Sequence, residues 1–147
     1  MNPKERVLFL CTGNSARSQM AEAFMRKYAG EYFDVYSAGL EPKAIHPFTI
    51  QVMEEKGYDL SGQASKGIDQ FLGKILIQTL ITVCDHAEKN CPRIWPGVNN
   101  KLHWSFEDPA AFEGPEPEKL MKFREIRDQI EDKVKDWLVE RGLHVTY

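Results

Sequence analysis

The N-terminal segment of this chain places an apolar run directly before a loop of small polar residues. Residues 7–10 read Val-Leu-Phe-Leu, and Gly13 and Asn14 follow shortly after them. A short, continuously apolar run bounded in this way is typical of a strand buried on both faces. Residues 17–28 then carry apolar side chains at helical spacing, and Gly30 ends the pattern. The chain therefore begins as strand, loop and helix.

The same alternation continues along the chain. Predicted strands cover residues 33–37, 80–84 and 102–104, and predicted helices cover residues 47–56 and 116–141, with a short helical piece at residues 67–72. Alternating strands and helices imply right-handed crossovers and a parallel sheet. We therefore predict one α/β domain over residues 1–147, with a four-stranded parallel sheet and helices on both of its faces.

The composition excludes several classes of protein. The formal net charge is −3, so a large basic face for nucleic acid is not expected. No apolar stretch approaches the ~20 residues of a membrane span, and the N-terminal apolar run is too short for a signal peptide. We expect a cytoplasmic monomer without nucleic-acid or membrane partners. Three cysteines in a reducing compartment indicate thiol chemistry or simple burial rather than a disulfide framework.

The loop from Cys11 to Arg17 has the features of an oxyanion-binding site. A loop that runs from a strand into a helix directs successive backbone N–H groups at one point, and the helix dipole adds partial positive charge there. The Arg17 guanidinium suits a tetrahedral oxyanion with two parallel hydrogen bonds. We expect this environment to convert Cys11 to its nucleophilic thiolate. The expected oxyanion-binding residues are Thr12, Gly13, Asn14, Ser15, Ala16, Arg17 and Ser18.

The setting of this loop favours a reactive cysteine over an inert one. Gly13 and Asn14 are residue types that adopt positive φ, which a tight loop requires. Cys84, at the end of a predicted strand, should lie on the same rim of the sheet as Cys11. The alternative is a buried, unreactive cysteine at a strand end, because a lone Cys-x5-Arg occurs by chance. Agreement of strand, loop and helix supports the catalytic interpretation.

These residues resemble the low-molecular-weight protein tyrosine phosphatase superfamily, and more closely the thioredoxin-coupled arsenate reductases within it. The matching segments are residues 11–22, Tyr36 to Gly39, Cys84-x6-Cys91-Pro92, His103-Trp104 and Asp108-Pro109. The resemblance implies a four-stranded parallel sheet flanked by helices. We expect no cofactor. The loop is common to both groups, so the later residues decide between them.

The resemblance to the reductases implies a relay of three thiols. Cys11 attacks arsenate, Cys84 attacks the Cys11 adduct with release of arsenite, and Cys91 then displaces Cys11. The resulting Cys84–Cys91 disulfide is the substrate of thioredoxin. Asp108 of the Asp-Pro turn is the implied general acid. Two alternatives remain open: a phosphatase that hydrolyses phosphomonoesters through a Cys11 phosphocysteine, and an oxyanion-binding sensor without turnover.

The spacing of Cys84 and Cys91 sets a condition on this relay. If the residues between them are helical, the two cysteines lie about 10 Å apart along the helix axis, beyond the Cα separation of about 4.4–6.8 Å that a disulfide tolerates. The segment must then unwind, which its polar composition permits at low cost. Ala110 and Ala111 follow the Asp-Pro turn where tyrosine phosphatases typically carry aromatic residues, and this favours a small oxyanion.

The sequence predicts no zinc-type metal site, because its histidines are scattered without ligand spacing. Some reductases that it resembles bind potassium with residues that match Asn14, Glu22 and Ser37 and with an aspartate, whose place here is taken by Lys66. An ammonium group would repel potassium at short range. We therefore expect Lys66 either to occupy the cation position beside Glu22 or to point to solvent.

Overall fold

A four-stranded parallel sheet lies at the centre of the computed structural model, which describes residues 4–143. Its strands are β1 (Glu5–Cys11), β2 (Phe33–Gly39), β3 (Thr79–Thr82) and β4 (Asn100–His103), in the order β2-β1-β3-β4. β1 pairs with two neighbours, and Val7 lies opposite Val35 on one side and opposite Thr79 on the other. The predicted parallel sheet is confirmed. The apolar run is fully buried because β1 is a central strand.

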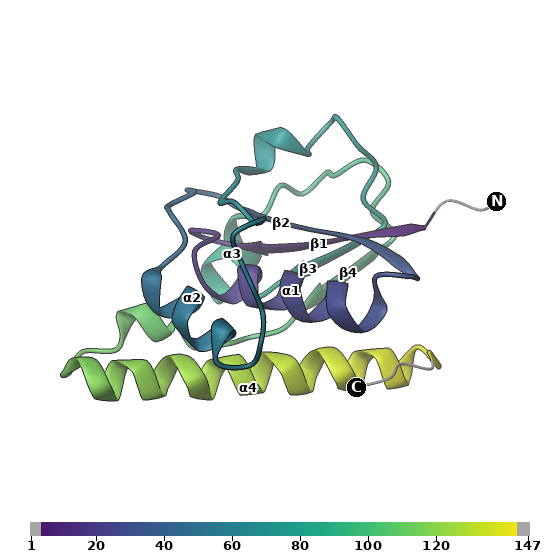
Figure 1. Ribbon diagram of the computed structural model, residues 1–147. Coiled ribbons are helices and arrows are strands. Elements are labelled where there is room, and N and C mark those ends of the chain that lie inside the picture. The colour runs from purple at the N-terminus through teal and green to yellow at the C-terminus, as the bar shows by residue number, and fades with distance from the viewer. Residues whose placement is uncertain (1–3, 144–147) are drawn as a thin grey trace.

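Helices and short turns cover both faces of the sheet. The elements are α1 (Arg17–Ala29), α2 (Pro47–Glu54), the 3-10 turn η1 (Ile68–Gln70), α3 (Asp85–Asn90), the 3-10 turn η2 (Pro109–Ala111) and α4 (Glu116–Glu140). Figure 1 shows α1 and α4 below the sheet and the teal segment around η1 above it. The crossovers that leave β1 and β3 run in opposite directions across the sheet, so right-handed connections place α1 and α3 on opposite faces.

The long C-terminal helix α4 closes the core through its apolar stripe. The predicted stripe residues are all buried: Phe123, Ile126, Ile130, Val134 and Trp137. The Trp137 ring lies edge-on to Trp104 at 6.3 Å, and Trp104 lies 5.7 Å from Phe9 of β1. This chain of rings joins α4 to the centre of the sheet.

The boundaries of several elements, among them β3, β4 and α2, differ from the prediction. β3 ends at Thr82, so Cys84 is not a strand residue; it is the N-cap of α3, and its sulfur accepts a hydrogen bond from the Ala87 N–H at 3.4 Å. The predicted strand 102–104 is shifted, because β4 runs from Asn100 to His103. α2 ends at Glu54, and a turn leads to Gly57, whose φ of 85° suits glycine.

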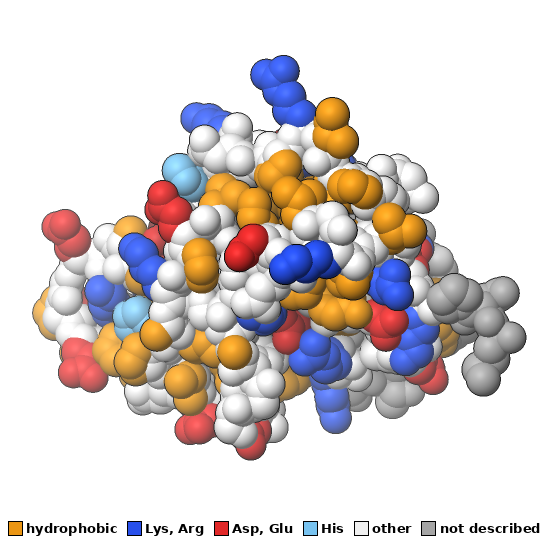
Figure 2. Space-filling view, turned by 90° about the horizontal axis from the view of Figure 1, so that it is seen from above, with side chains coloured by type: hydrophobic (Ala, Val, Ile, Leu, Met, Phe, Trp, Pro, Cys, Tyr) orange, Lys and Arg blue, Asp and Glu red, His pale blue; other side chains and the backbone are white. Residues whose placement is uncertain are grey.

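The face of the molecule opposite α4 carries mixed charges. Figure 2 shows the face turned away from α4, where Lys and Arg side chains alternate with Asp and Glu around hydrophobic side chains. Among the described residues, no helix is both long and apolar enough to cross a membrane.

The strand order creates a crevice at the carboxyl ends of β1 and β3. The chain leaves these adjacent strands toward opposite edges of the sheet, and ligands of such folds bind at this point. Cys11 ends β1, and Cys84 lies two residues beyond the end of β3. The sheet therefore brings these two cysteines to the same rim, as predicted.

Candidate active site

The loop between β1 and α1 wraps around the Cys11 sulfur. The Asn14 N–H donates to the Cys11 Sγ at 3.1 Å. Asn14 is the residue of this loop that adopts positive φ, at 51°, whereas Gly13 does not. The prediction that this loop needs the left-handed region is thus confirmed for Asn14 and wrong for Gly13. The strained asparagine turns its own N–H toward the sulfur.

A second segment, residues 40–46, is hydrogen-bonded along the loop and fixes its shape. Four N–H groups donate to four carbonyls of the loop: Leu40 to Cys11 at 3.1 Å, Glu41 to Thr12 at 2.8 Å, Lys43 to Gly13 at 2.8 Å and His46 to Ser15 at 3.0 Å. The loop carbonyls therefore point outward to residues 40–46, which leaves the opposite side of the loop for the N–H groups.

The loop forms one wall of a pocket of about 230 Å³. The pocket is lined by Cys11, Thr12, Gly13, Ser15, Ala16, Arg17, Lys43, Ala44, His46, Asp108 and Ala110. Five of the seven predicted oxyanion-binding residues thus line it. Asn14 and Ser18 are fully buried beside the sulfur instead, so they support Cys11 rather than line the pocket.

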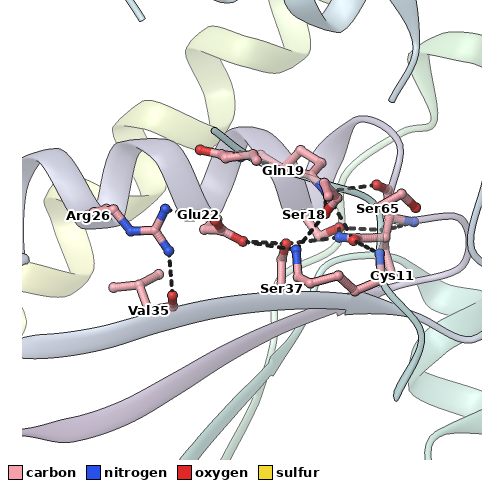
Figure 3. A network of polar contacts seen from close by, with 12 residues as sticks. Cys11, Ser18, Gln19, Glu22, Arg26, Val35, Ser37 and Ser65 are labelled. Atoms are coloured by element: carbon pink, nitrogen blue, oxygen red, sulfur yellow. Dashed lines mark hydrogen bonds and ion pairs between the residues drawn. The ribbon is translucent and has the colours of Figure 1, made fainter. Parts of the chain in front are cut away.

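A buried chain of hydrogen bonds runs from the sulfur into the protein (Figure 3). The Ser18 hydroxyl lies 2.8 Å from the Cys11 Sγ, and the Asn14 amide donates to Ser18 at 2.8 Å and to Ser37 at 2.9 Å. The Ser37 hydroxyl in turn donates to the Glu22 carboxylate at 2.6 Å. Because Ser18 accepts from Asn14, its own proton is free to point at the sulfur.

Burial nevertheless raises the pKa of the Cys11 thiol above its ordinary value. The Ser18 hydroxyl, the N–H groups of Asn14 and Ser18 and the charge of Arg17 lower this pKa, but their combined effect is smaller than that of burial. The donors around the sulfur favour the thiolate and burial opposes it, so the conversion of Cys11 to its thiolate stays a prediction.

Arg17 links the loop to the segment that carries Asp108. Its guanidinium donates to the Phe106 carbonyl at 3.0 Å and lies 3.8 Å from the Asp108 carboxylate. The other oxygen of Asp108 accepts from the Ala110 N–H at 3.0 Å, and Asp108 is thereby the N-cap of η2. Both side chains face the pocket that holds Cys11. The structure thus brings together the predicted nucleophile, cation and acid.

Cys84 lies beside the loop but outside the pocket. Its sulfur is 3.5 Å from the Thr12 hydroxyl, and the residue is almost fully buried. The three cysteines are free thiols in this structure.

Cys91 lies at the far end of α3 and is the C-cap of that helix. It is 9% exposed, so it is not an incidental surface thiol. Burial raises its pKa, Lys101 lowers it and Glu88 raises it further. α3 therefore separates Cys91 from Cys84 by the helical distance that the sequence analysis anticipated.

Lys66 occupies the position beside Glu22 and does not point to solvent. Its ammonium lies 3.8 Å from the Glu22 carboxylate and donates to the Ala64 carbonyl at 2.6 Å. Burial lowers the pKa of Lys66, while the charge of Glu22 raises it. The Lys66 ammonium thus already faces the Glu22 carboxylate, so the site does not fit a potassium ion in addition.

Sequence reasoning missed three residues that line the pocket: Lys43, Ala44 and His46. His46 is the N-cap of α2, where its Nδ1 accepts from the Phe48 N–H at 3.0 Å. A histidine directly before Pro47 is a helix-start signal that would have located this residue at a helix end. Nothing in the sequence places it at the pocket. Within residues 4–143, no cluster of three or more His, Cys, Asp and Glu side chains is arranged to hold a metal ion.

Known proteins with similar sequences agree with this fold and with this site. The family described as low molecular weight phosphotyrosine protein phosphatase matches residues 6–144. An arsenate reductase of Halalkalibacterium halodurans is 45% identical over 132 residues, which cover 90% of this chain and 94% of that protein.

Solved structures agree. One described as an arsenate reductase in the phosphate binding state has a TM-score of 0.76 at 33% identity and covers 92% of this chain and 98% of its own. A thioredoxin-dependent arsenate reductase of Corynebacterium glutamicum has a TM-score of 0.69 at 28% identity. The match covers 95% of this chain and 62% of the Corynebacterium chain.

Proposed function

Since this chain belongs to the low molecular weight phosphotyrosine protein phosphatase family, and there to its arsenate reductases, we propose that it reduces arsenate to arsenite with thioredoxin as electron donor. The observation that carries the proposal is the second thiol at the loop: the Cys84 sulfur lies 3.5 Å from the Thr12 hydroxyl. A hydrolytic phosphatase needs one nucleophile and water, whereas a reductase must draw two electrons from thiols.

The first step forms a bond between Cys11 and arsenic. Arsenate enters the pocket and binds to loop N–H groups and to Arg17. Because the Cys11 pKa is raised, an oxygen of the arsenate dianion takes the thiol proton. The sulfur attacks arsenic, and an oxygen leaves as water with a proton from Asp108. The arsenic remains As(V), bound to the sulfur.

The second step is the reduction. The Cys84 sulfur attacks the Cys11 sulfur, and the sulfur–arsenic bond breaks with its electron pair on arsenic. Arsenite leaves as As(III), and the two thiols have lost two electrons in forming a Cys11–Cys84 disulfide. The contact between Cys84 and Thr12 supports this order, because it keeps Cys84 at the edge of the loop that holds Cys11.

The third step moves the oxidising equivalents away from the pocket. Cys91 attacks the Cys84 sulfur and releases Cys11 as a thiolate, which leaves a Cys84–Cys91 disulfide. A thioredoxin dithiol then reduces it by the same exchange chemistry.

The pocket also suits a small oxyanion. It has a volume of about 230 Å³, and Ala44 and Ala110 are among the residues that line it. In the segment after Asp108, no aromatic side chain lines the pocket to hold a phenyl ring. We therefore propose inorganic arsenate, rather than an aryl phosphate, as the substrate.

The test is arsenate-dependent oxidation of reduced thioredoxin, measured beside hydrolysis of an aryl phosphate. We expect rapid thioredoxin oxidation, abolished in Cys11→Ser and strongly reduced in Arg17→Lys, because a lysine cannot form two parallel hydrogen bonds to one oxyanion. Hydrolysis without thioredoxin oxidation would assign the chain as a phosphatase. Phosphate binding with neither activity would assign it as an oxyanion sensor.

A further inference from the structure

The short helix α3 stands between the two cysteines that exchange in the last step of the proposed relay. Cys84 is its N-cap and Cys91 its C-cap. Seven residues of helix correspond to about 10 Å of rise, whereas a disulfide requires Cα atoms about 4.4–6.8 Å apart. The Cys84–Cys91 disulfide therefore forms only if α3 unwinds. This inference rests on the proposed function.

Polar contacts rather than apolar packing hold α3 in place. Ala87 is its one buried residue, and its other side chains are polar or charged. The first turn carries Asp85 and Glu88, which are one helical turn apart and lie on the same side of α3. Such a helix has little intrinsic stability, so the contacts of these two carboxylates decide whether it stays helical.

Both carboxylates face His103, the last residue of β4. The His103 Nε2 lies 3.0 Å from Asp85 Oδ1, and its Nδ1 lies 2.8 Å from the Thr82 hydroxyl and 3.7 Å from Glu88 Oε2. Thr82 is the last residue of β3 and pairs with His103 across the sheet. One imidazole thus connects the rigid ends of two strands to both carboxylates of the first turn.

Hydrogen bonds join both ring nitrogens of His103 to neighbouring elements. The Thr82 hydroxyl, 2.8 Å from Nδ1, also donates to the Glu88 carboxylate at 2.6 Å. The Asp85 carboxylate accepts from Nε2 and from the Ser105 hydroxyl, which lies 3.0 Å away. Two lysines lie near these carboxylates: Lys101 is 4.0 Å from Glu88, and the charge of Lys89 acts on Asp85. His103 therefore lies between the two carboxylates of the first turn of α3.

We propose that His103 is a positioning residue that holds α3 helical and thereby keeps Cys84 and Cys91 apart in the dithiol state. Oxidation removes two electrons and two protons from these thiols and requires the contacts of Asp85 and Glu88 with His103 to separate. The contacts thus stabilise the dithiol relative to the disulfide. Their effect is to make the disulfide easier for a thioredoxin dithiol to reduce.

The proposal is tested by the equilibrium between the Cys84–Cys91 dithiol and disulfide in glutathione buffers of defined ratio. Each variant is made in the full chain with Cys11→Ser, so that Cys11 does not compete, and the disulfide is quantified by mass spectrometry. We expect His103→Gln to shift the equilibrium constant about tenfold toward the disulfide, which is about 30 mV more negative for two electrons. Asp85→Asn should shift it in the same direction.

The matched control is His86→Gln, the same substitution on α3 itself. The contacts of His86 are with Asn90 of the same helix and not with β4. We expect the midpoint potential of the Cys84–Cys91 pair in His86→Gln to equal that of the parent. The double variant His103→Gln, Asp85→Asn should shift the equilibrium by less than the sum of the two single effects, because both substitutions remove the contact between His103 and Asp85. The Asp85 side chain is 72% exposed, so we expect Asp85→Asn to fold normally. This variant therefore tests the same contact if the substitution at His103 impairs folding.

The outcomes separate this inference from the proposed function. If both variants match the control while the unsubstituted protein oxidises thioredoxin with arsenate, the role of His103 is wrong and the relay stands. If the parent forms no Cys84–Cys91 disulfide in any buffer, the relay and the role of His103 are both overturned.

Discussion

The Thr12 hydroxyl and the Cys84 sulfur lie 3.5 Å apart, although 72 positions separate the two residues in the sequence. Thr12 directly follows the proposed nucleophile Cys11, and Cys84 is the N-cap of the helix that leads to Cys91. The contact therefore joins the proposed arsenate pocket to the segment that carries the oxidising equivalents away in the proposed relay. It is possible because β1 and β3 are neighbours in the sheet.

Removal of this hydroxyl should slow the reduction step. Thr12→Val keeps the shape of the side chain but leaves the attacking Cys84 sulfur without its hydrogen-bond partner. We expect arsenite release in a single turnover to slow about tenfold, which corresponds to about 1.4 kcal/mol. Thr12→Ser retains the hydroxyl and should release arsenite at nearly the rate of the parent. Equal rates for the valine and serine variants would show that the contact has no role in the reaction.

The cysteine variants should stop the relay at two different points. Cys91→Ser should release one equivalent of arsenite and then accumulate as the Cys11–Cys84 disulfide, because the thiol that resolves it is absent. Cys84→Ser should stop earlier, with arsenic still bound to Cys11 and no arsenite released. Peptide mapping by mass spectrometry identifies each species. A direct Cys11–Cys91 disulfide in the cycling parent would contradict this order.

The Ser18 hydroxyl should control how readily Cys11 loses its proton. Burial raises the pKa of Cys11, and Ser18 is the largest influence that lowers it. Ser18→Ala should therefore raise the pKa further, so that alkylation by iodoacetamide needs a higher pH to reach half its maximal rate. The measurement uses the Cys84→Ser, Cys91→Ser background, in which Cys11 alone reacts. Ser15→Ala, in the same loop, is the control and should leave the midpoint unchanged.

The sequence was sufficient to predict the sheet and the loop because each depends on local pattern. The run at residues 7–10 is continuously apolar and the stripe of α4 repeats at the helical period, and both proved buried. The effect of burial on the Cys11 thiol could not be predicted, for the opposite reason. Its pKa depends on how deeply residues from distant segments bury the sulfur, and no local pattern reports that burial.

Contacts between segments that are far apart in the sequence likewise could not be predicted from local sequence pattern. The bond of Arg17 to the Phe106 carbonyl spans 89 positions, and the position of Lys43 at the pocket depends on how residues 40–46 lie along the loop. Lys66 is an intermediate case, because the resemblance gave two placements and the structure selects the one beside Glu22.

Gly39 should be essential for stability because the end of β2 passes directly against the loop. A Cβ at Gly39 would lie 2.7 Å from the Thr12 carbonyl oxygen and 2.9 Å from the Asn14 nitrogen. Both are backbone atoms that cannot move without distorting the loop, so Gly39→Ala should lower the free energy of unfolding by about 1–3 kcal/mol. Gly62→Ala is the control, because its Cβ would meet nothing within 4 Å. Its effect in urea unfolding should stay within about 0.5 kcal/mol. Equal stabilities of the two variants would disprove the steric argument.

The Lys66 ammonium should make the reaction independent of potassium. It lies 3.8 Å from Glu22, a carboxylate that is also bonded to Ser37 and, at 3.0 Å, to Arg26. A potassium ion near this carboxylate would meet a fixed positive charge in a partly buried site, where the repulsion is large. We expect equal arsenate reduction in potassium and tetramethylammonium buffers of the same ionic strength. Lys66→Asp should create a potassium dependence, because it replaces the cation with a further carboxylate. Lys66→Met removes the charge without adding a ligand, and so separates the loss of the ammonium from the gain of a site. A clear potassium-specific increase in the unsubstituted protein would refute the assignment of Lys66 as the resident cation.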